Sequence, residues 1–445
     1  MRILPTIALA HRRVPHKLVL LCLLVPVFLF LLARNYAKSH YYRDPTSKFF
    51  DPSRAYEQRY SNVRRREADA FVNISNTKPC RRTSKSPPLL CAGMLTIARP
   101  SGDVYFRTSI GSLLAGLTPK ERDEIHLVPF IGHTNASVHP VFEEPWLDNI
   151  ADFVLTYNDS KFISDEQYGH VQKLERERQR TNLPDREKHL FDYTLILKEC
   201  ESIGAKYVAI FEDDVLALDG WFHRMKRGLQ EIERRTKLKG QSGFYYLRLF
   251  YTEKQLGWNS EEWLLYLRWG PSIILIITVV NAIMFLFLYR TSLIQKHGRI
   301  LLSASLLTIC LMIVFFFSSG RVSMLPLPEG VHEMTKYGCC AQAIVYPQNK
   351  VPILTKWYEE KRIGFVDTLA EELGDERPDE MGVRWALTPS VVQHVGGKSS
   401  KGDAQWDEKV QYDHGKTISE SLWNFAYELN DADVLRKEHI SEAGS

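Results

Sequence analysis

Residues 206–215 read KYVAIFEDDV, an apolar run that passes directly into three acidic residues. The segment from Tyr207 to Phe211 has the composition and length of a buried strand. Before it, residues 189–204 have the apolar spacing of a helix, and Gly204 is placed to end that helix. A helix followed by a strand with polar residues at its carboxyl end is typical of an α/β domain.

Strands and helices alternate on both sides of this stretch as well. We therefore predict an α/β fold with a mainly parallel sheet, whose ligands bind at the carboxyl ends of the strands. Residues 56–71 are predicted to form an additional surface helix. The other expected strands are 89–98, 124–132, 152–157, 243–253, 337–347 and 386–396, and the other expected helices are 104–117, 352–361 and 365–374.

Three apolar segments, 18–34, 271–289 and 301–319, approach the roughly 20 residues that a helix needs to span a bilayer. The first follows a basic tail, and no cleavage motif of small residues comes soon after it. This pattern favours a retained anchor over a cleaved signal peptide. The other two contain no charged residue and are joined by a short basic link, 290–300, which favours a membrane hairpin over two buried helices of a soluble core.

The charges around these segments predict their topology, because short basic segments stay in the cytoplasm. The tail 1–17 and the link 290–300 are therefore expected to be cytoplasmic. A stem at 35–88 and a catalytic domain in two parts, 89–256 and 330–445, would share the lumenal side. The sequons at Asn73, Asn135 and Asn158 all fall in the predicted lumenal segments.

Overall composition excludes little, but it gives no reason to expect nucleic acid as a partner. The formal net charge is +4, and charges of both signs are mixed along the chain. Five of the seven cysteines lie in the predicted lumenal segments, where disulfides persist. At most two bridges can form among five cysteines, and the sequence does not decide the pairing. These five are Cys80, Cys91, Cys200, Cys339 and Cys340.

The acidic residues Glu212, Asp213 and Asp214 are the main candidates for chemistry. Three carboxylates at the end of a strand repel one another unless a cation neutralises them. Oxygen ligands suit Mg²⁺ or Mn²⁺, and such a cation could help a nucleoside diphosphate to leave. An acidic turn that starts a helix is the alternative interpretation, since aspartate suits that position.

Other candidates are weaker from the sequence alone. His394, at the end of a predicted strand, is a possible second metal contact, because neutral imidazole is an acceptable ligand. Lys188 and Asp192 could bind a sugar or phosphate, or could simply form a helical ion pair at i, i+4 spacing. An inverting transfer needs a general base, and spacing does not choose among Asp367, Glu371, Glu372, Asp375, Glu376 and Asp379.

Four pieces of this chain, EKHLFDYTLIL (187–197), KYVAIFEDDV (206–215), GFVDTLAEEL (364–373) and LTPSVVQHVGGKSS (387–400), resemble in this order the GT-A glycosyltransferases that include the N-glycan-branching GlcNAc-transferases. An N-terminal anchor, an EDD motif and a hairpin that splits the catalytic domain resemble more closely the post-GPI-attachment GalNAc-transferases. Those are Golgi membrane enzymes that add a side-chain GalNAc to the mannose of GPI anchors. The resemblance covers roughly residues 89–400.

This resemblance implies inverting transfer from UDP-GalNAc to GPI-anchored proteins, with Mn²⁺, by a multi-pass Golgi protein whose GT-A-like catalytic domain is lumenal. It also implies roles for individual residues. Asp367 would be the catalytic base, although the residues just before it, Gly364-Phe365-Val366, depart from the Pro-Ile or Pro-Val expected there. Asp214 and His394 would bind the metal, and Thr96, Arg99, Lys188, Asp192, Glu212 and Asp213 would bind the donor.

Three alternatives remain at this stage. One is an N-glycan-branching GlcNAc-transferase, which would not need a hairpin. The second is a membrane-bound glycan-binding protein that keeps the fold without turnover, against which the intact acidic triplet argues. The third is a small transporter, which three spans without pore-lining charge and a large lumenal domain disfavour.

Overall fold

A computed structural model describes residues 16–99, 102, 104–181, 185–241, 243–288, 292–334, 340–396 and 422–443. The chain forms two compact units. The sheet unit combines Tyr56–Gln255 with Leu327–Ser445, and the helical unit combines Met1–Ala55 with Leu256–Pro326. Residues 56–88, which the sequence suggested as part of a stem, are thus grouped with the sheet unit.

A seven-stranded mixed sheet forms the centre of the sheet unit, with strand order β2-β1-β3-β7-β5-β8-β6. The pairs β1/β2, β1/β3 and β5/β8 are parallel, whereas β7 is antiparallel to both neighbours and β6 is antiparallel to β8. The short strands β4 and β9 form a separate antiparallel pair. The strands are β1 Leu90–Thr96, β2 Ile125–Ile131, β3 Tyr207–Glu212, β4 Val215–Ala217, β5 Phe244–Arg248, β6 Gly330–Glu333, β7 Ala343–Pro347, β8 Val383–Thr388 and β9 Val392–His394.

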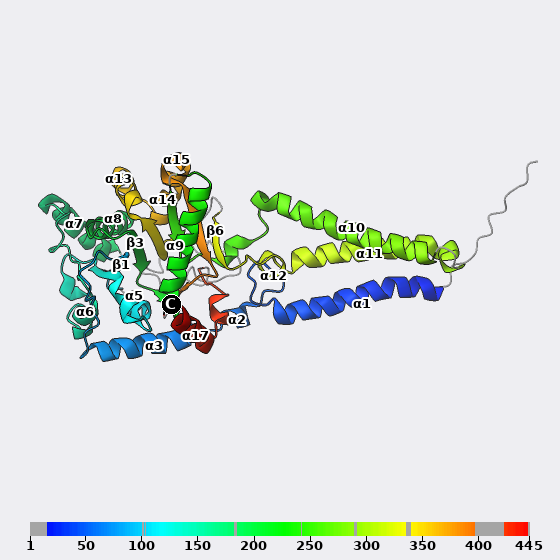
Figure 1. Ribbon diagram of the computed structural model, residues 1–445, viewed down its shortest axis with the longest axis horizontal. Coiled ribbons are helices and arrows are strands. Elements are labelled where there is room, and N and C mark those ends of the chain that lie inside the picture. Colours follow the sequence, from blue (N-terminus) through cyan, green and yellow to red (C-terminus); the bar gives the residue numbers. More distant parts are fainter. Residues whose placement is uncertain are drawn as a thin grey trace, which may run out of the picture. The chain divides into compact units, whose positions relative to one another are not determined.

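Helices cover both faces of this sheet (Figure 1). In β3, Ala209 and Phe211 face one apolar core, which α3, α4 and α9 complete, while Val208 and Ile210 face a second core completed by α8, α13 and α14. This period of two explains why β3 is apolar throughout, since both of its faces are buried. The helices are α3 Tyr60–Ser75, α4 Phe106–Leu114, α5 Pro119–Asp123, α6 Pro145–Ile150, α7 Asp165–Thr181, α8 Arg186–Ser202, α9 Trp221–Leu238, α13 Val351–Lys361, α14 Val366–Glu376, α15 Pro378–Met381 and α17 Ala432–Ala443.

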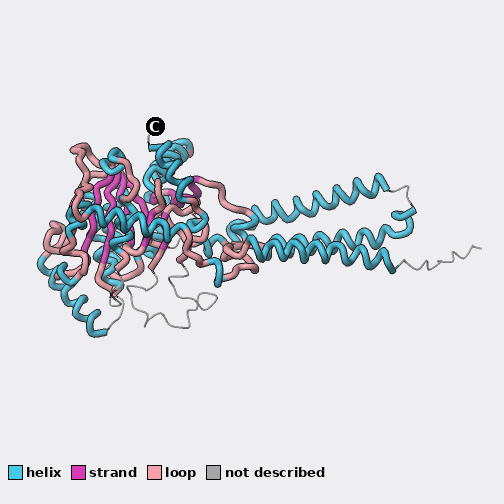
Figure 2. The backbone as a smooth tube through the Cα atoms, turned by 90° about the horizontal axis from the view of Figure 1, so that it is seen from below, coloured by secondary structure: helices cyan, strands magenta, loops and turns pink. Residues whose placement is uncertain are grey.

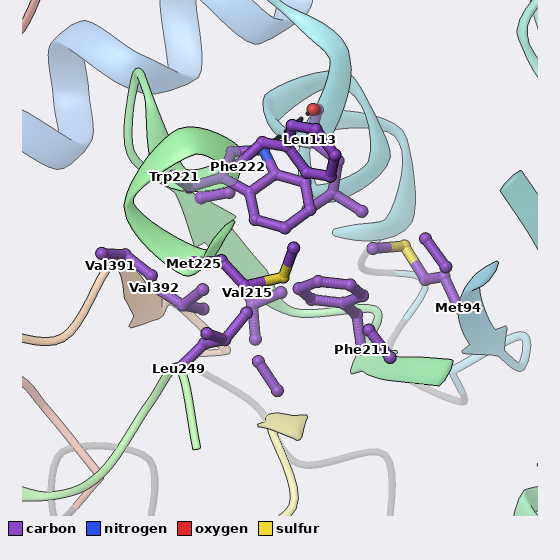
Figure 3. Packing of buried hydrophobic residues seen from close by; sticks show 14 of the residues in the cluster. Met94, Leu113, Phe211, Val215, Trp221, Phe222, Met225, Leu249, Val391 and Val392 are labelled. Carbon is purple, nitrogen blue, oxygen red and sulfur yellow. Dashed lines mark hydrogen bonds between the residues drawn. The ribbon is translucent and has the colours of Figure 1, made fainter. Parts of the chain in front are cut away.

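The first core packs tightly beneath the end of β3. Figure 3 shows Phe211, Trp221 and Met225 directed toward one another, and the Trp221 indole N–H donates a hydrogen bond to the Leu113 carbonyl (3.0 Å). Val215 of β4 and Val392 of β9 join the same cluster. The strand ends that carry the acidic residues therefore rest on a close-packed support.

Helix α3 confirms the surface helix predicted over residues 56–71, and it buries one face against the sheet unit. Tyr60, Arg64 and Val72 are buried. The Arg64 guanidinium donates hydrogen bonds to the carbonyls of Ala217 (2.8 Å), Ser112 (2.7 Å) and Ala115 (2.7 Å). The buried face of this helix therefore contributes to the sheet unit's core, while Asn62 and Arg66 on its other face are exposed.

Three details of the predicted fold are corrected. The sheet is mixed and not mainly parallel, because β7 enters antiparallel between β3 and β5. Residues 152–157 form no strand, and contribute an isolated bridge between Phe130 and Leu155. The strand expected at 386–396 is two strands, β8 and β9, which pair with different partners on either side of a cis Thr388–Pro389 peptide bond.

Cysteine pairing, which the sequence left open, is partly resolved by the structure. A disulfide joins Cys91 of β1 to Cys200 of α8, and Cys340 is disulfide-bonded as well. Cys80 is a free thiol. Cys339 lies outside the described residues.

The helical unit is built on three long helices, α1 His16–His40, α10 Trp263–Leu288 and α11 Ser292–Ser318, with short α2 Pro52–Ala55 and α12 Arg321–Met324. α11 packs against both α1 and α10, as the bundle of long helices in Figure 2 shows. Within the part of the chain that the structure describes, one helical segment, Trp263–Ile283, is long and apolar enough to cross a membrane, and the apolar segment Leu302–Ser318 is shorter. The three-span arrangement therefore stays a prediction.

Candidate active site

The carboxyl ends of β1 and β3 bring the predicted acidic residues next to Thr96 and Arg99. β1 and β3 are parallel neighbours, with Leu95 opposite Glu212, so residues that follow the two strands meet at one edge of the sheet. The Thr96 hydroxyl donates a hydrogen bond to Asp213 Oδ2 (2.7 Å), and the Arg99 guanidinium forms an ion pair with Asp213 Oδ1. The Asp213 carbonyl accepts a hydrogen bond from the Ser109 hydroxyl of α4 (2.6 Å). Asp213 is thus fixed at both its backbone and its side chain.

Asp214 lies beside His394, although 180 positions separate the two residues in the sequence. The pairing of β4 with β9 places Val215 opposite His394, and the Val395 N–H donates to the Asp214 carbonyl (2.8 Å). His394 Nε2 lies 3.5 Å from Asp214 Oδ2, and Arg99 Nη2 lies 3.1 Å from the same oxygen. Two strands from different halves of the chain therefore build this part of the site.

Glu212 is the third member of the acidic motif and has a different environment. Its backbone N–H donates to the Gln342 carbonyl (3.0 Å), and its carboxylate accepts a hydrogen bond from the Gln342 amide (3.2 Å). Gln342 immediately precedes β7, the second strand after the predicted hairpin in sequence. The sequence did not suggest Gln342, because nothing in its spacing indicates that β7 would lie beside β3.

Burial and charge shift the pKa values of this cluster in opposite directions. Burial, together with repulsion from Asp214, raises the pKa of Asp213 in spite of Arg99. Burial also acts to raise the pKa of Asp214, but His394 and Arg99 outweigh it and lower that pKa. The pKa of His394 is raised because Asp214 outweighs the effect of burial, and Asp213 and Asp214 raise the pKa of Arg99 in the same way. Of the two aspartates, Asp214 is therefore the one whose ionised form is favoured more strongly.

The donor set of Asp214 and His394 is chemically suited to a divalent cation. Asp214 Oδ1 and His394 Nδ1 are buried and have no hydrogen-bond partner among the described residues. Buried polar atoms without partners are unusual in proteins, and an ion is one of the explanations for them. Carboxylate oxygen and imidazole nitrogen are both ligands of Mn²⁺. The residues present thus fit the metal that the resemblance implies.

Lys188 and Asp192 form a second polar cluster at the end of β2. The Lys188 ammonium donates to the Gly132 carbonyl (2.7 Å) and to Asp192 Oδ2 (2.7 Å), and it lies 3.7 Å from Glu175. The Tyr157 hydroxyl hydrogen-bonds to Asp192, whose pKa is raised chiefly by burial. Lys188 and Asp192 do form the i, i+4 ion pair that the sequence allowed, but both side chains are buried, so the pair does not lie on a solvated helical face.

This second cluster adjoins the first through the strand ends. The Gly132 N–H donates to the Thr96 carbonyl (2.9 Å), and His139 Nε2 lies 3.0 Å from the Thr96 hydroxyl. Burial lowers the pKa of His139 to about 4, so this imidazole is neutral. Sequence reasoning missed His139 and Glu175, because both lie beyond the predicted strands and no motif spacing marks them.

The predicted base, Asp367, lies at the start of α14. Its carboxylate accepts a hydrogen bond from the Thr368 N–H (2.9 Å), and within the described part of the chain no hydrogen bond or ion pair joins it to the acidic cluster. Glu371, one turn later, is committed elsewhere: it pairs with the buried Arg248 (2.7 Å) and with Arg384 (2.6 Å), and it hydrogen-bonds Tyr246. Asp367 is thus the acidic residue in the first turn of α14, and among the described residues it forms no ion pair.

An α/β sheet with an acidic triplet at its carboxyl edge, beside a histidine from a late strand, has the residue types that can bind a metal ion together with a phosphate-containing ligand. The family model of GPI-N-acetylgalactosamine transferase PGAP4 matches residues 135–392, which is more than half of the chain, and the chain belongs to this family. It is thus a glycosyltransferase of the hexosaminyltransferase type. A comparison with curated proteins gives no match.

Most of the candidate residues fall inside the matched segment. Lys188, Asp192, Glu212–Asp214 and Asp367 lie within residues 135–392, and so does the predicted hairpin. Thr96 and Arg99 precede the segment, and His394 follows it by two positions. For these three residues the contacts described above are the link to the acidic motif.

Proposed function

We propose that this chain transfers GalNAc from UDP-GalNAc to the core mannose of GPI anchors, with inversion and with Mn²⁺, at the carboxyl edge of the sheet. The observation that carries this proposal is the position of Asp214 beside His394, 3.5 Å apart, with a buried and unpartnered atom on each. The family match supports the sugar and the acceptor class.

The donor would bind along the ends of β1 and β3. Asp214 and His394 would hold the metal, which supplies positive charge to the leaving diphosphate when it is bound. Glu212 and Asp213 would contact the nucleotide sugar, with Asp213 held in place by Thr96 and Arg99. Arg99 contacts both aspartates in this structure. When a metal ion binds Asp214, the Arg99 guanidinium would be able to bind the diphosphate of the donor. Lys188 and Asp192 would serve the sugar side of the donor, because they adjoin the Thr96 end of the site.

Inversion requires a base that takes the proton of the acceptor hydroxyl as the donor bond breaks. We assign this role to Asp367. Its carboxylate is partly exposed at the helix start, whereas Glu371 is held by two arginines that keep it from accepting a proton. Acidic residues near a helix N-terminus are stabilised in the ionised form, which suits a base before the transfer.

The helical unit would anchor the enzyme in the Golgi membrane with the sheet unit in the lumen. Apolar side chains on α1, α10 and α11 are exposed, as expected of helices that contact lipid. The chain after α1 is tied to the chain after α11: the Arg321 N–H donates to the Thr46 hydroxyl (2.7 Å), and the Ser323 N–H donates to Asp44 (2.7 Å). Three helices joined in this way would hold the enzyme near a lipid-linked acceptor and raise its effective concentration.

The proposal is tested by sugar transfer to GPI-anchored proteins in membranes from cells that lack their own side-chain enzyme. UDP-GalNAc and Mn²⁺ are supplied to the wild type, to Asp214→Ala and to Asp433→Ala, an exposed acid of α17 that serves as the matched control. We expect transfer by the wild type and the control, and loss with Asp214→Ala or EDTA. Digestion of the product with anomer-specific hexosaminidases reports inversion.

Two outcomes would contradict parts of the proposal. Transfer that survives EDTA and Asp214→Ala would exclude the metal site. Transfer of GlcNAc to N-glycans in place of GalNAc to GPI would favour the branching alternative. The membrane role has its own test, in which a soluble linker replaces residues 263–318. Unchanged activity on membrane-bound GPI proteins would exclude the effective-concentration argument, while activity on a detergent-extracted GPI glycan reports that the site is intact.

A further inference from the structure

Three side chains with metal-binding atoms meet at a place that the proposed function does not use. Glu121 comes from α5, His223 from the first turn of α9, and His439 from the C-terminal helix α17. One potential ligand atom of each lies within 4.8 Å of the others. Glu121 and His439 are buried, and His223 is partly buried.

One ring nitrogen of each histidine contacts a carboxylate outside the proposed ligand set. His439 Nδ1 lies 2.7 Å from Asp219 Oδ1, so its Nε2 faces Glu121 Oε2, 2.9 Å away. His223 Nε2 lies 3.3 Å from Glu438 Oε1, which leaves Nδ1 as the nitrogen of its ring that is free to bind. A carboxylate on the far nitrogen fixes the tautomer and orientation of a metal-binding histidine and raises its basicity.

Two buried atoms of this cluster have no partner among the described residues: Glu121 Oε1 and His223 Nδ1. Glu121 is 95% buried, since its exposed fraction is 5%. Its other oxygen, Oε2, accepts hydrogen bonds from the backbone and side chain of Thr118 (2.9 Å each). Burying these two atoms without a hydrogen-bond donor costs free energy. A cation bound between them would offset that cost.

We propose that Glu121, His223 and His439 bind a zinc-type divalent cation, separate from the cation of the acidic motif. Two imidazoles and one carboxylate are a common set of protein ligands for Zn²⁺, which leaves its fourth position to water. This nitrogen-rich set favours zinc over Mg²⁺ or Mn²⁺. Binding would replace the proton that His439 Nε2 shares with Glu121 and release it to solvent.

Such a cation would fasten the C-terminal helix to the rest of the sheet unit. Of the apolar side chains of α17, Leu435 is buried, whereas Val434 and Ile440 are exposed. Its ion pairs include those of Arg436 with Asp219 (2.9 Å), of Glu438 with Arg224 (3.0 Å) and of Glu442 with Arg227 (3.8 Å). Because little apolar surface holds α17, a ligand contributed by His439 would add most to its attachment.

The experiment uses the full chain in detergent, carrying Asp214→Ala so that the acidic motif contributes no signal. The protein is stripped with chelator and titrated with Co²⁺, whose tetrahedral complexes absorb strongly in the visible range. We expect one Co²⁺ per chain with such a spectrum, displaced by Zn²⁺, and a higher Tm in the presence of Zn²⁺.

Three variants separate the proposed site from a plain ion pair between His439 and the two carboxylates. His223→Ala is expected to lose the Co²⁺ spectrum. Glu438→Gln, which keeps every ligand atom, is expected to weaken binding by about 10–100-fold and so guards against misfolding of His223→Ala. Arg227→Ala, which removes an ion pair to α17 without touching the cluster, should bind as the parent does. A parent chain without a visible Co²⁺ spectrum, or His223→Ala and Glu438→Gln that both bind as the parent does, would overturn the proposal.

Discussion

Gly396 offers the sharpest test of the Asp214–His394 site, because it packs directly against the Asp214 carboxylate. A Cβ at this position would lie 2.3 Å from Asp214 Oδ2 and 2.9 Å from Asp214 Cγ. Gly396 is not among the glycines with positive φ, so alanine strains no backbone angle there. Gly396→Ala therefore acts on the carboxylate and not on the chain.

The size of the effect follows from the distance. Ordinary Cβ contacts begin at 3.4 Å, so Asp214 must move by about 1 Å, away from positions set by Arg99 (3.1 Å) and His394 (3.5 Å). A displacement of about 1 Å at a catalytic group costs on the order of 10²-fold in rate, which corresponds to about 2.7 kcal/mol. We expect kcat/KM for GalNAc transfer to fall by about that factor, and half-maximal activity to require more Mn²⁺.

Initial rates of transfer to a GPI acceptor, measured across a series of Mn²⁺ concentrations, give both quantities. Gly169→Ala is the matched control, because a Cβ there would meet nothing within 4 Å. The control should match the wild type. If Gly396→Ala showed wild-type rates and an unchanged Mn²⁺ requirement while Asp214→Ala was inactive, the carboxylate would not act from the position that β9 gives it, and the reasoning would be refuted.

Three further predictions concern stability and the choice of base. Glu371→Ala leaves the fully buried Arg248 without its carboxylate, so thermal unfolding should show a loss of about 3–5 kcal/mol, while the folded fraction keeps its transfer rate; a stable but inactive variant would instead make Glu371 the base. Burial lowers the folded-state pKa of His139 to about 4, below the unfolded value near 6.5, so stability present at pH 7 is lost as the pH falls below about 6.5. His139 Nδ1 accepts a hydrogen bond from the Val141 N–H (3.4 Å), and we expect about 1–2 kcal/mol of unfolding free energy to be lost at pH 5. The Tm of His139→Gln should therefore depend less steeply on pH than that of the wild type, and equal slopes for both proteins would contradict this. Arg64→Met removes the guanidinium hydrogen bonds to three buried carbonyls and should destabilise the sheet unit by about 3 kcal/mol or more, whereas a Tm unchanged from the wild type would show that Arg64 does not hold α3 in place.

Local patterns in the sequence were sufficient to predict the elements that line the site. The apolar run that ends in acid became β3, and the helix before it ends as predicted, with Gly204 in the left-handed conformation just after α8. Thr96 and Arg99, which the resemblance placed at the donor, lie beside the acidic motif because β1 and β3 are parallel neighbours. The strand and helix predictions needed only periodicity and turn signals, whereas the neighbour of β3 is known from the structure.

Features that depend on long-range pairing could not be read in this way. Residues 386–396 look like one apolar strand, yet a break at Pro389 sends Val392–His394 to pair with β4 in place of the main sheet. β7 has the composition of any buried strand, and nothing in that composition indicates that it pairs antiparallel with β3. His139 and Gln342 lie at the site because of such tertiary contacts. A histidine or glutamine in the sequence does not by itself indicate which residues it will contact.

The same pairing explains how a long insertion can divide the catalytic sequence without dividing the site. β5 ends at Arg248 and β7 begins at Ala343, and these ends lie together, because the Leu249 N–H donates to the Ala343 carbonyl (3.0 Å). The chain thus leaves the sheet after β5, returns to its edge as β6 beside β8, and then comes back beside β5 as β7. Lengthening the connection between β5 and β6 costs little, since loop-closure entropy grows only with the logarithm of length. Asp214 and His394 are set by β4 and β9, which the core around Phe211 and Trp221 supports from one side. The position of the two residues is therefore a property of the sheet unit and does not depend on the length of the insertion.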